Sequence, residues 1–130
     1  MSITLLDGGT SSTAGGAAQE FDRTSTPVNN GVEYADVAEA DFFARQKIIL
    51  VSRMPSLQSD GSWSKKKTSA RFISPITLAD GSISYNVTRV ETELHPESSA
   101  ANLTEHREYA AQMALDAELD DFYVAGTLPG

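Results

Sequence analysis

The sequence predicts an α+β protein in which the strands come first and the helices last. Up to residue 94, short runs of alternating or β-branched residues are separated by Asp-Gly and Asn-Gly turn signals, which is typical of antiparallel strands. After Pro96 the spacing of apolar residues changes from two to three and four, which is typical of helices. Strands followed by helices favour an antiparallel sheet with helices over one face.

The first part of the chain is expected to form a hairpin and the beginning of the sheet. A short apolar strand, SITLLD, runs into the turn signal Asp7-Gly8. After a segment of small residues comes a polar strand, QEFDRTST. A turn cluster containing Pro27, Asn30 and Gly31 then leads into a third strand, VEYADV.

The central part is expected to form two further hairpins. FFARQKIILVSRM is the clearest strand because it is rich in β-branched residues. Asp60-Gly61 is predicted to turn the chain back into SKKKTSARFI, and Asp80-Gly81 to turn it into the alternating strand ISYNVTRVETEL.

Two helices are expected to close the chain. Ser98 or Ser99 is a suitable N-cap for the first, whose apolar residues recur at helical spacing from Leu103 onward. Asp116 is expected to cap a second short helix, AELDDFYVA, which ends at Gly126.

Basic residues gather in one part of an acidic chain. The net charge is −8, yet Lys65, Lys66, Lys67 and Arg71 lie within seven positions. Because strand side chains alternate between faces, the basic residues of three strands are expected to share a sheet face with Tyr85. This basic set is Arg45, Lys47, Arg53, Lys65, Lys67, Arg71 and Arg89. Two interpretations stay open: a solvated loop or charge-protected edge, and a surface for single-stranded nucleic acid.

No group of residues indicates catalysis or a metal site. The chain has no cysteine, and His95 and His106 have no second histidine at ligand spacing, so both are expected to be exposed. The acidic segment DAELDD lacks the glycine and the final glutamate of a calcium loop. The paired glycines lack the helix and Lys-Ser/Thr of a phosphate-binding loop. We therefore expect no enzyme activity, cofactor, metal or small-molecule substrate.

The chain is expected to be intracellular and to need a second copy. No apolar run approaches the ~20 residues that span a bilayer, and the N-terminus does not resemble a secretory signal. The short helices offer few large apolar residues, and the sheet face that they would cover includes Asn86, Thr88 and Thr92. A monomer would bury this surface poorly, so a second chain is expected to complete the core.

The order of these segments resembles the coat proteins of single-stranded RNA bacteriophages, the levivirus-like family. ITLLDGGT resembles the family's first strand and turn, and NNGV the start of the next strand. RQKIILVSRMPS with KKKTSARFISP resembles the long central hairpin, and SYNVTRVETEL the last strand. The segment from Ser98 onward is similar to two closing helices and a short tail. The likeness covers nearly the whole chain through order, spacing and length.

The resemblance implies one domain over residues 1–130. It consists of an N-terminal hairpin (1–26), a five-stranded antiparallel sheet (32–94), two C-terminal helices (98–125) and a tail (126–130). It further implies an intertwined homodimer with a continuous ten-stranded sheet, in which each chain's helices clasp its partner. Such dimers would form the icosahedral capsid of a virion, assembled in the bacterial cytoplasm around single-stranded RNA. Binding of an RNA hairpin would also repress translation of the replicase.

The resemblance also implies where RNA is contacted. The RNA-binding residues carried over by position are Lys47, Arg53, Lys65, Lys67, Arg71, Tyr85 and Arg89. Where well-studied members have small hydroxyl residues in an adenine pocket, this chain has Ile49 and Val51. Acidic residues are expected away from this face, and they include Glu33, Asp36, Glu118, Asp120 and Asp121. The loop PITLADGS corresponds to the one that makes contacts around symmetry axes.

One rival interpretation belongs to a different class of protein. A small, non-viral dimeric binding module that recognises a protein partner through its sheet would have the same strands, helices and charge. The size of the expressed product separates the two interpretations, because a coat protein forms large RNA-containing particles.

Overall fold

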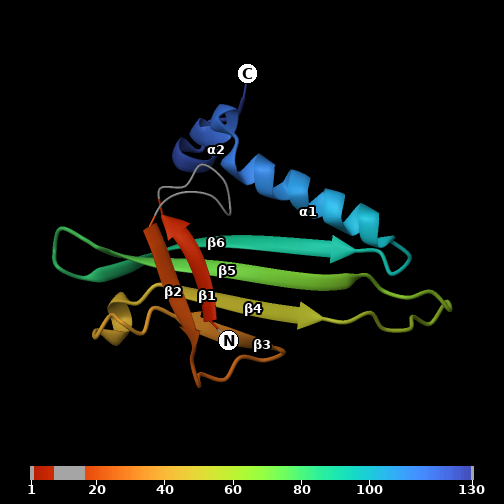
Figure 1. Cartoon of the computed structure of the whole chain (residues 1–130), viewed down its shortest axis with the longest axis horizontal. Coiled ribbons are helices and arrows are strands. Elements are labelled where there is room, and N and C mark those ends of the chain that lie inside the picture. Colours follow the sequence, from red (N-terminus) through yellow and green to blue (C-terminus); the bar gives the residue numbers. More distant parts are fainter. Residues whose placement is uncertain (1, 8–16, 130) are drawn as a thin grey trace. The chain divides into compact units, whose positions relative to one another are not determined.

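The structure is a computed structural model that describes residues 2–7 and 17–129. Strands precede helices, so the predicted α+β fold class is confirmed (Figure 1). The strands are β1 (Ser2–Asp7), β2 (Ala17–Arg23), β3 (Gly31–Ala35), β4 (Lys47–Arg53), β5 (Lys66–Thr77) and β6 (Ile83–Leu94). The α-helices are α1 (Ala100–Leu115) and α2 (Asp120–Ala125), and the 3₁₀ helices are η1 (Phe42–Ala44) and η2 (Ala117–Leu119). The predicted turn at Asp7-Gly8 extends outside the described residues.

Within the described part of the chain, the strands form one sheet of six, in chain order from β1 to β6. The sequence predicted a hairpin beside a five-stranded sheet. In the structure the hairpin strands β1 and β2 belong to the same sheet as the four strands that follow. By contacts the chain divides into two compact units, Met1–Thr4 with Gln19–Pro96, and Leu5–Ala18 with Glu97–Gly130.

The register from β3 to β6 decides which side chains share a face. Pairing is antiparallel throughout, for example Arg53↔Lys67 between β4 and β5. In these three pairings every odd-numbered residue lies opposite an odd-numbered one. Because paired residues share a face and successive residues alternate, the odd-numbered side chains of β3 to β6 lie on one face. We call it the odd face, and the opposite one the even face.

The beginning of β4 differs from the prediction. Phe42 to Ala44, predicted as strand, form the 3₁₀ helix η1. The Asp41 carboxylate accepts a hydrogen bond from the backbone N–H of Phe43 at 3.0 Å, and the Asp41 carbonyl accepts one from Ala44 at 3.0 Å. A short polar side chain that captures a nearby N–H competes with an extended strand, so β4 begins only at Lys47.

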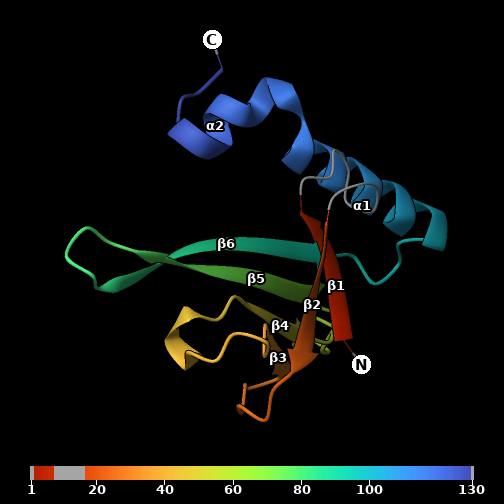
Figure 2. The same ribbon diagram turned by 60° about the vertical axis from the view of Figure 1, so that its left-hand side comes forward.

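β5 is longer than predicted because it continues through Pro75 to Thr77. Proline has no N–H to give to a ladder, so it is tolerated where one neighbouring strand is missing. The last pair between β4 and β5 is Lys47↔Ile73, so Pro75 lies beyond β4 and pairs only with Tyr85 of β6. Figure 2 shows β5 and β6 running on together to their turn.

Two Asp-Gly-Ser turns join the long strands, as predicted. In the first, the Asp60 carboxylate accepts hydrogen bonds from the N–H and Oγ of Ser62, at 3.0 and 2.6 Å. In the second, Asp80 accepts the same two bonds from Ser82, at 2.9 and 2.6 Å. These bonds lower the pKa of Asp60 and of Asp80, and the hydroxyl bond contributes most in each.

Gly31 is required where β3 approaches β4. It follows Asn30, whose φ of 57° lies in the left-handed region that Asn tolerates. A Cβ on Gly31 would overlap the backbone carbonyl of Leu50 on β4. The Asn-Gly turn signal therefore marks a close approach of two backbones as well as a turn.

The core is small and lies mainly on the even face. Its centre is a cluster of Phe21, Tyr34 and Ile48. The ring of Phe21, from β2, contacts that of Phe72 edge to face, with centroids 6.3 Å apart. Partly buried around the cluster are Ile3, Val32, Leu50 and Phe72. Few apolar side chains of the first unit are removed from water within one chain.

A buried ion pair lies on the odd face. Glu33 is 5% exposed, its Oε1 is 3.7 Å from the ammonium of Lys47, and its Oε2 accepts a 2.6 Å hydrogen bond from Thr24. The same ammonium lies 4.6 Å from the centre of the Phe42 ring. Glu33 was predicted to lie away from the basic face, and this prediction is wrong. Its carboxylate is buried because Lys47 neutralises it there.

In the second unit, the helix signals work as predicted. Ser99 caps α1, with its Oγ accepting from the N–H of Asn102 at 3.2 Å. Asp116 accepts a 2.9 Å bond from the N–H of Glu118 and begins η2. Gly126, at φ 73°, ends α2 in the left-handed conformation. Neither α-helix has a buried residue in the single chain.

We predict that Ser62→Ala raises the pKa of Asp60 towards its ordinary value of 3.8 and leaves Asp80 unchanged, whereas Ser82→Ala does the reverse. A carboxylate with a lowered folded-state pKa stabilises the fold above its unfolded-state pKa, and this contribution disappears as the pH falls through the folded-state value. Acid titration of the carboxyl carbons by NMR measures both groups in one sample. Equal titration of Asp60 in the parent and in Ser62→Ala would contradict the assigned hydrogen bond.

We also predict that Lys47→Met destabilises the fold by on the order of 2 kcal/mol, because Glu33 would be left buried without its cation. Lys67→Met is the matched control: its partner Glu93 is about half exposed, so the loss is expected to be about 0–1 kcal/mol. Denaturant unfolding of both variants measures the difference. If the two variants lost equal stability, the Glu33–Lys47 pair would not be a stabilising buried contact.

Candidate nucleic-acid interface

The odd face collects most of the basic residues of the sheet. Six cationic side chains lie on β4, β5 and β6. Five of them share the odd face, and these are Lys47, Arg53, Lys67, Arg71 and Arg89. Only Lys66 lies on the even face, opposite Leu94. The predicted convergence of basic residues from three strands on one face is therefore confirmed for these five.

Two arginines lie directly opposite each other in the middle of this face. Arg71 of β5 pairs with Arg89 of β6, and on its other side Arg71 faces Ile49 of β4. The Nε of Arg71 is buried and has no hydrogen-bond partner among residues 2–7 and 17–129. Like charges on directly opposed positions destabilise a sheet, and a buried donor without a partner costs further free energy. A bound anion would offset the repulsion between the two guanidinium groups.

Carboxylates are interleaved with these cations. Lys67 lies 3.4 Å from Glu93, and Arg89 lies 3.8 Å from Glu91. All four of these side chains are at least half exposed, so their contacts are weak and can be exchanged. The same alternation that places Arg89 on the odd face also places Glu91 and Glu93 there. The face is therefore less positive than predicted.

Two predicted members of the basic set lie outside the strands. Arg45 precedes β4, and its Nε donates a 2.8 Å hydrogen bond to the carbonyl of Glu39, so it does not join the odd face of the sheet. Lys65 precedes β5 by one residue and is exposed. Among the described residues, neither Lys65 nor Arg53 forms an ion pair within 4.0 Å. The ammonium group of Lys65 and the guanidinium group of Arg53 are therefore available to another molecule.

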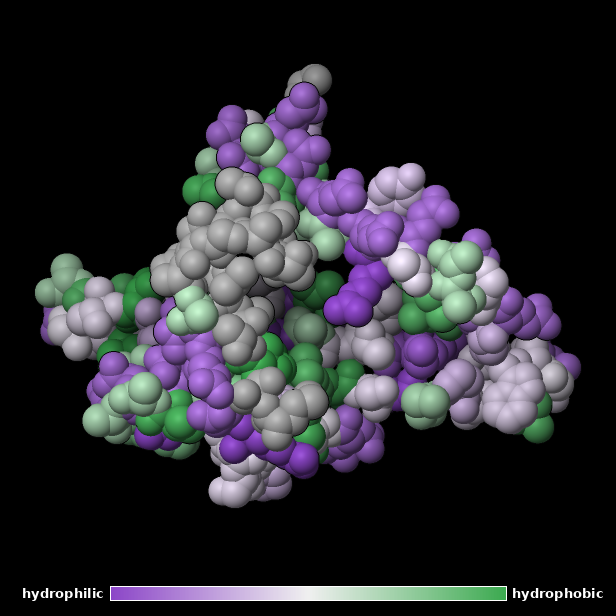
Figure 3. Space-filling model, viewed as in Figure 1, coloured by the Kyte–Doolittle hydropathy of each residue, from purple (hydrophilic) through white to green (hydrophobic). Residues whose placement is uncertain are grey.

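Tyr85 lies on the odd face near the start of β6, four positions before Arg89. Its ring is 44% exposed, which leaves a surface for stacking. Its hydroxyl donates a 3.1 Å hydrogen bond to the carbonyl of Phe43 in η1. This bond links β6 to the connection between β3 and β4 and restricts the orientation of the ring. The pair of Phe42 and Phe43 beside it is exposed, and Figure 3 shows hydrophobic surface where η1 and the β5–β6 turn lie.

An open pocket of about 310 Å³ lies among β4, β5 and β6 at the other end of the strands. Its lining residues are Val51, Arg53, Lys67, Thr68, Ser69, Glu91, Thr92 and Glu93. The pocket thus combines one apolar residue, three hydroxyl groups, two cations and two carboxylates. Val51 lies opposite Ser69, so a hydroxyl group faces Val51 from the neighbouring strand.

Other kinds of site find no support in the described residues. Within residues 2–7 and 17–129, no three His, Asp or Glu side chains come together in a way that could hold a metal ion. His95 and His106 are exposed, as predicted. No helix in the described part of the chain is long and apolar enough to cross a membrane.

Comparison with known proteins identifies the family. No protein-family model and no curated protein matches the chain. The chain is similar to the virus-like particle of bacteriophage GQ-907, at 30% identity over 91% of this chain and 89% of that one, with a TM-score of 0.82. It is also similar to the virus-like particles of bacteriophage AVE019 (13% identity, 100% and 97% of the two chains, TM-score 0.72) and Beihai levi-like virus 21 (11%, 99% and 96%, 0.71).

The last two likenesses show the fold alone, because their sequence identity is low. The GQ-907 particle adds an identity of 30% over nearly the whole length of both chains. The α+β fold, with its antiparallel sheet and two closing helices, agrees with the resemblance found in the sequence. The chain belongs to the coat proteins of levi-like RNA bacteriophages, a family of capsid-forming structural proteins that are not enzymes.

Proposed function

We propose that this coat protein forms a homodimer, that dimers assemble into an icosahedral shell in the bacterial cytoplasm, and that the odd face binds the packaged single-stranded RNA. The opposed pair Arg71 and Arg89 carries the RNA part of this proposal. A guanidinium group forms two parallel hydrogen bonds to a phosphate. A phosphate between the two arginines would offset the repulsion between their guanidinium groups.

The other cations of the odd face are suited to follow an RNA backbone. Arg53 and Lys65 are exposed and have no carboxylate within 4.0 Å among the described residues. Lys67 and Arg89 contact exposed carboxylates, and such contacts contribute little to stability. Lys47 differs, because Glu33 and Phe42 engage its ammonium. We therefore assign Lys47 chiefly to the fold and the remaining predicted cations to RNA.

Base contacts would supplement the phosphate contacts. The half-exposed ring of Tyr85 offers a face for stacking, and the pocket beside Ser69 has room and hydroxyl groups for a base edge. The same surface would serve an RNA hairpin, which is the translational repression that the family resemblance implies. The adenine contacts would come from Ser69 of β5 and not from β4, where Ile49 and Val51 lie.

The dimer part of the proposal rests on the free edge of β6. In the described sheet, β6 pairs only with β5 and leaves twelve residues of its other edge unpaired. Val87 and Val90 on this strand are 53% and 54% exposed. A long free strand edge promotes pairing with another chain. Pairing of β6 with its copy across a two-fold axis would join the sheets of two chains into one.

The helices support the same conclusion. Neither α1 nor α2 buries a residue in the single chain, and several of their large apolar side chains are at least 40% exposed. These side chains are Tyr109, Met113, Leu115, Phe122, Tyr123 and Val124. An isolated helix of this kind gains its stability by packing against another surface. The predicted clasp by each chain's helices on its partner would supply that surface.

For RNA binding, we predict that Arg71→Gln lowers the RNA content of purified particles and the affinity of stripped subunits for single-stranded RNA. Each lost phosphate contact should make the slope of log K against log salt shallower by about 0.7. Lys66→Gln is the matched control, because it removes one charge from the same strand on the even face. Equal effects of the two substitutions would show that the odd face is not the RNA-binding surface.

For dimerisation, we predict that Val90→Asp prevents assembly, because a charge on the even face of β6 would be buried without a partner beneath the helices of the second chain. Val37→Asp, at an exposed valine outside the strands, should still assemble. Native mass spectrometry and electron microscopy distinguish a 13.9 kDa chain from its dimer and from a nuclease-resistant particle. If the parent chain stays a small species and never forms particles, the binding-module interpretation replaces the shell. If Val90→Asp forms normal particles, the interface is not at β6.

A further inference from the structure

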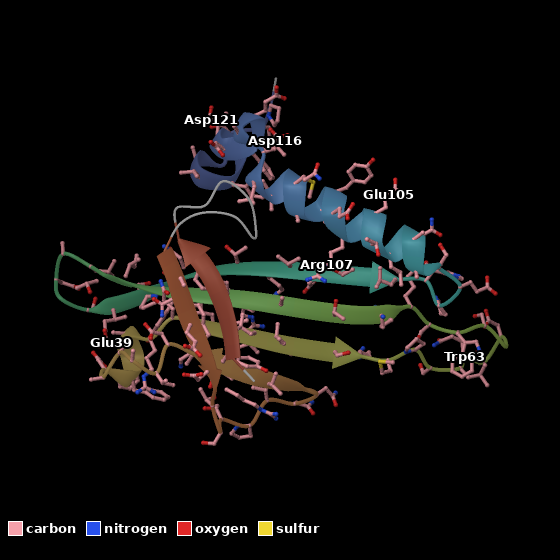
Figure 4. All side chains as sticks on the ribbon, viewed as in Figure 1. Glu39, Trp63, Glu105, Arg107, Asp116 and Asp121 are labelled. Carbon is pink, nitrogen blue, oxygen red and sulfur yellow. The ribbon has the colours of Figure 1, made fainter. Side chains whose placement is uncertain are left out.

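The connection between β4 and β5 is an ordered hairpin that carries the only tryptophan of the chain, Trp63. Leu57 and Trp63 form an isolated β-bridge within it. Backbone hydrogen bonds join Ser64 to Ser56 at 2.9 Å and Gln58 to Ser62 at 2.7 Å. These bonds, with the Asp60 turn, hold Trp63 in a defined position. In Figure 4 Trp63 lies on this hairpin, at the end of the sheet far from Glu39.

The register of this hairpin continues that of the sheet. Leu57 lies opposite Trp63, and the nearest pair of the β4–β5 ladder is Arg53↔Lys67. Leu57 is four positions after Arg53, and Trp63 is four positions before Lys67. The two segments therefore have equal length, and neither has an inserted residue. Residues 54–56 and 64–65, between the ladder and this bridge, are not part of a strand, so the bridge continues the register of β4 and β5 without belonging to their ladder.

The surroundings of Trp63 combine an exposed aromatic ring with free cations. Trp63 is 58% exposed and Leu57 beside it 63% exposed. Lys65, two residues along the same strand, and Arg53, at the base of the hairpin, have no ion-pair partner within 4.0 Å among the described residues. The only carboxylate of the hairpin, on Asp60, is occupied by Ser62. The hairpin therefore presents a ring and positive charge together.

We propose that Trp63 stacks on a base of single-stranded RNA whose phosphates are bound by Lys65 and Arg53. This inference rests on the proposed RNA-binding function. It extends the RNA-binding surface from the strands to the hairpin, and Trp63 is not one of the RNA contacts predicted from the sequence. Indole rings stack on bases of any sequence, and adjacent cations bind the connecting phosphates. Charge complementarity selects RNA as the occupant, because an apolar protein contact would leave both cations without a partner.

The test uses the intrinsic fluorescence of subunits stripped of RNA, to which Trp63 is the only tryptophan contributor. The probe is a labelled single-stranded RNA of roughly ten nucleotides, whose anisotropy reports binding independently of Trp63. Stacking should quench the Trp63 emission in step with the rise in anisotropy. Trp63→Leu should weaken binding about 5- to 150-fold, whereas Trp63→Phe, which keeps an aromatic ring, should retain most of the affinity.

Leu128→Ala is the control, because it removes an exposed large apolar side chain outside the sheet and should leave RNA affinity unchanged. Binding of the RNA without any change in Trp63 emission, or equal affinities of the parent and Trp63→Leu, would overturn this inference and leave the RNA-binding function intact. Loss of particles in Trp63→Leu with unchanged RNA affinity would also overturn it, in favour of a contact between copies. Absence of RNA binding by the parent chain would overturn the proposed function as well.

Discussion

The antiparallel pairing of β4, β5 and β6 in one unbroken register is the constraint on which the rest of the structure depends. Because no residue is inserted between paired positions, the alternation of each strand is preserved across all three. One face then receives five cations, and the other receives Ile48, Leu50 and Phe72 for the core. A shift by one residue in any strand would exchange its charged and apolar sides. The same register continues into the hairpin that carries Trp63.

The odd face combines charges held in the fold with charges available to a ligand. Glu33 neutralises Lys47 inside the protein, and both are largely removed from water. Towards β6 the carboxylates Glu91 and Glu93 are exposed, so their contacts with Arg89 and Lys67 can be replaced. Arg71, between these two regions, has a donor that nothing in the described chain satisfies. The face therefore suits reversible binding of a polyanion by a protein whose net charge is −8.

Incomplete burial has a physical reason in a coat protein. A subunit that must join others benefits from apolar surface that stays open until assembly, because its burial stabilises the contact. The cluster of Phe21, Tyr34 and Ile48 holds the first unit together. The β6 strand and the two helices keep apolar side chains exposed in the single chain. Burial of these side chains between chains would stabilise the assembly. Stability and assembly of such a subunit are therefore expected to be inseparable.

The sequence by itself determined the elements whose signals are local. The turns at Asp60-Gly61 and Asp80-Gly81, the caps Ser99 and Asp116 and the end of α2 at Gly126 depend on residues within a few positions of one another. The structure confirms these signals. The bounds of β6 were also predicted, because its alternation is unbroken. The segment Phe42–Ala44 was expected to be strand and forms η1, because the Asp41 carboxylate accepts a hydrogen bond from the N–H of Phe43.

Only the tertiary structure decided which side chains meet. Alternation showed that Arg71 and Arg89 could share a face, but their direct opposition depends on the register between strands, and register is a non-local property. The burial of Glu33 against Lys47 and Thr24 joins residues from β4 and from the segment after β2, which no spacing in the sequence reveals. The position of Trp63 opposite Leu57 likewise follows from the pairing of two segments and not from a local signal. The alternation of side chains and the capping of helices depend on neighbouring residues in the chain. Strand pairing and side-chain burial depend on segments that are distant in the sequence.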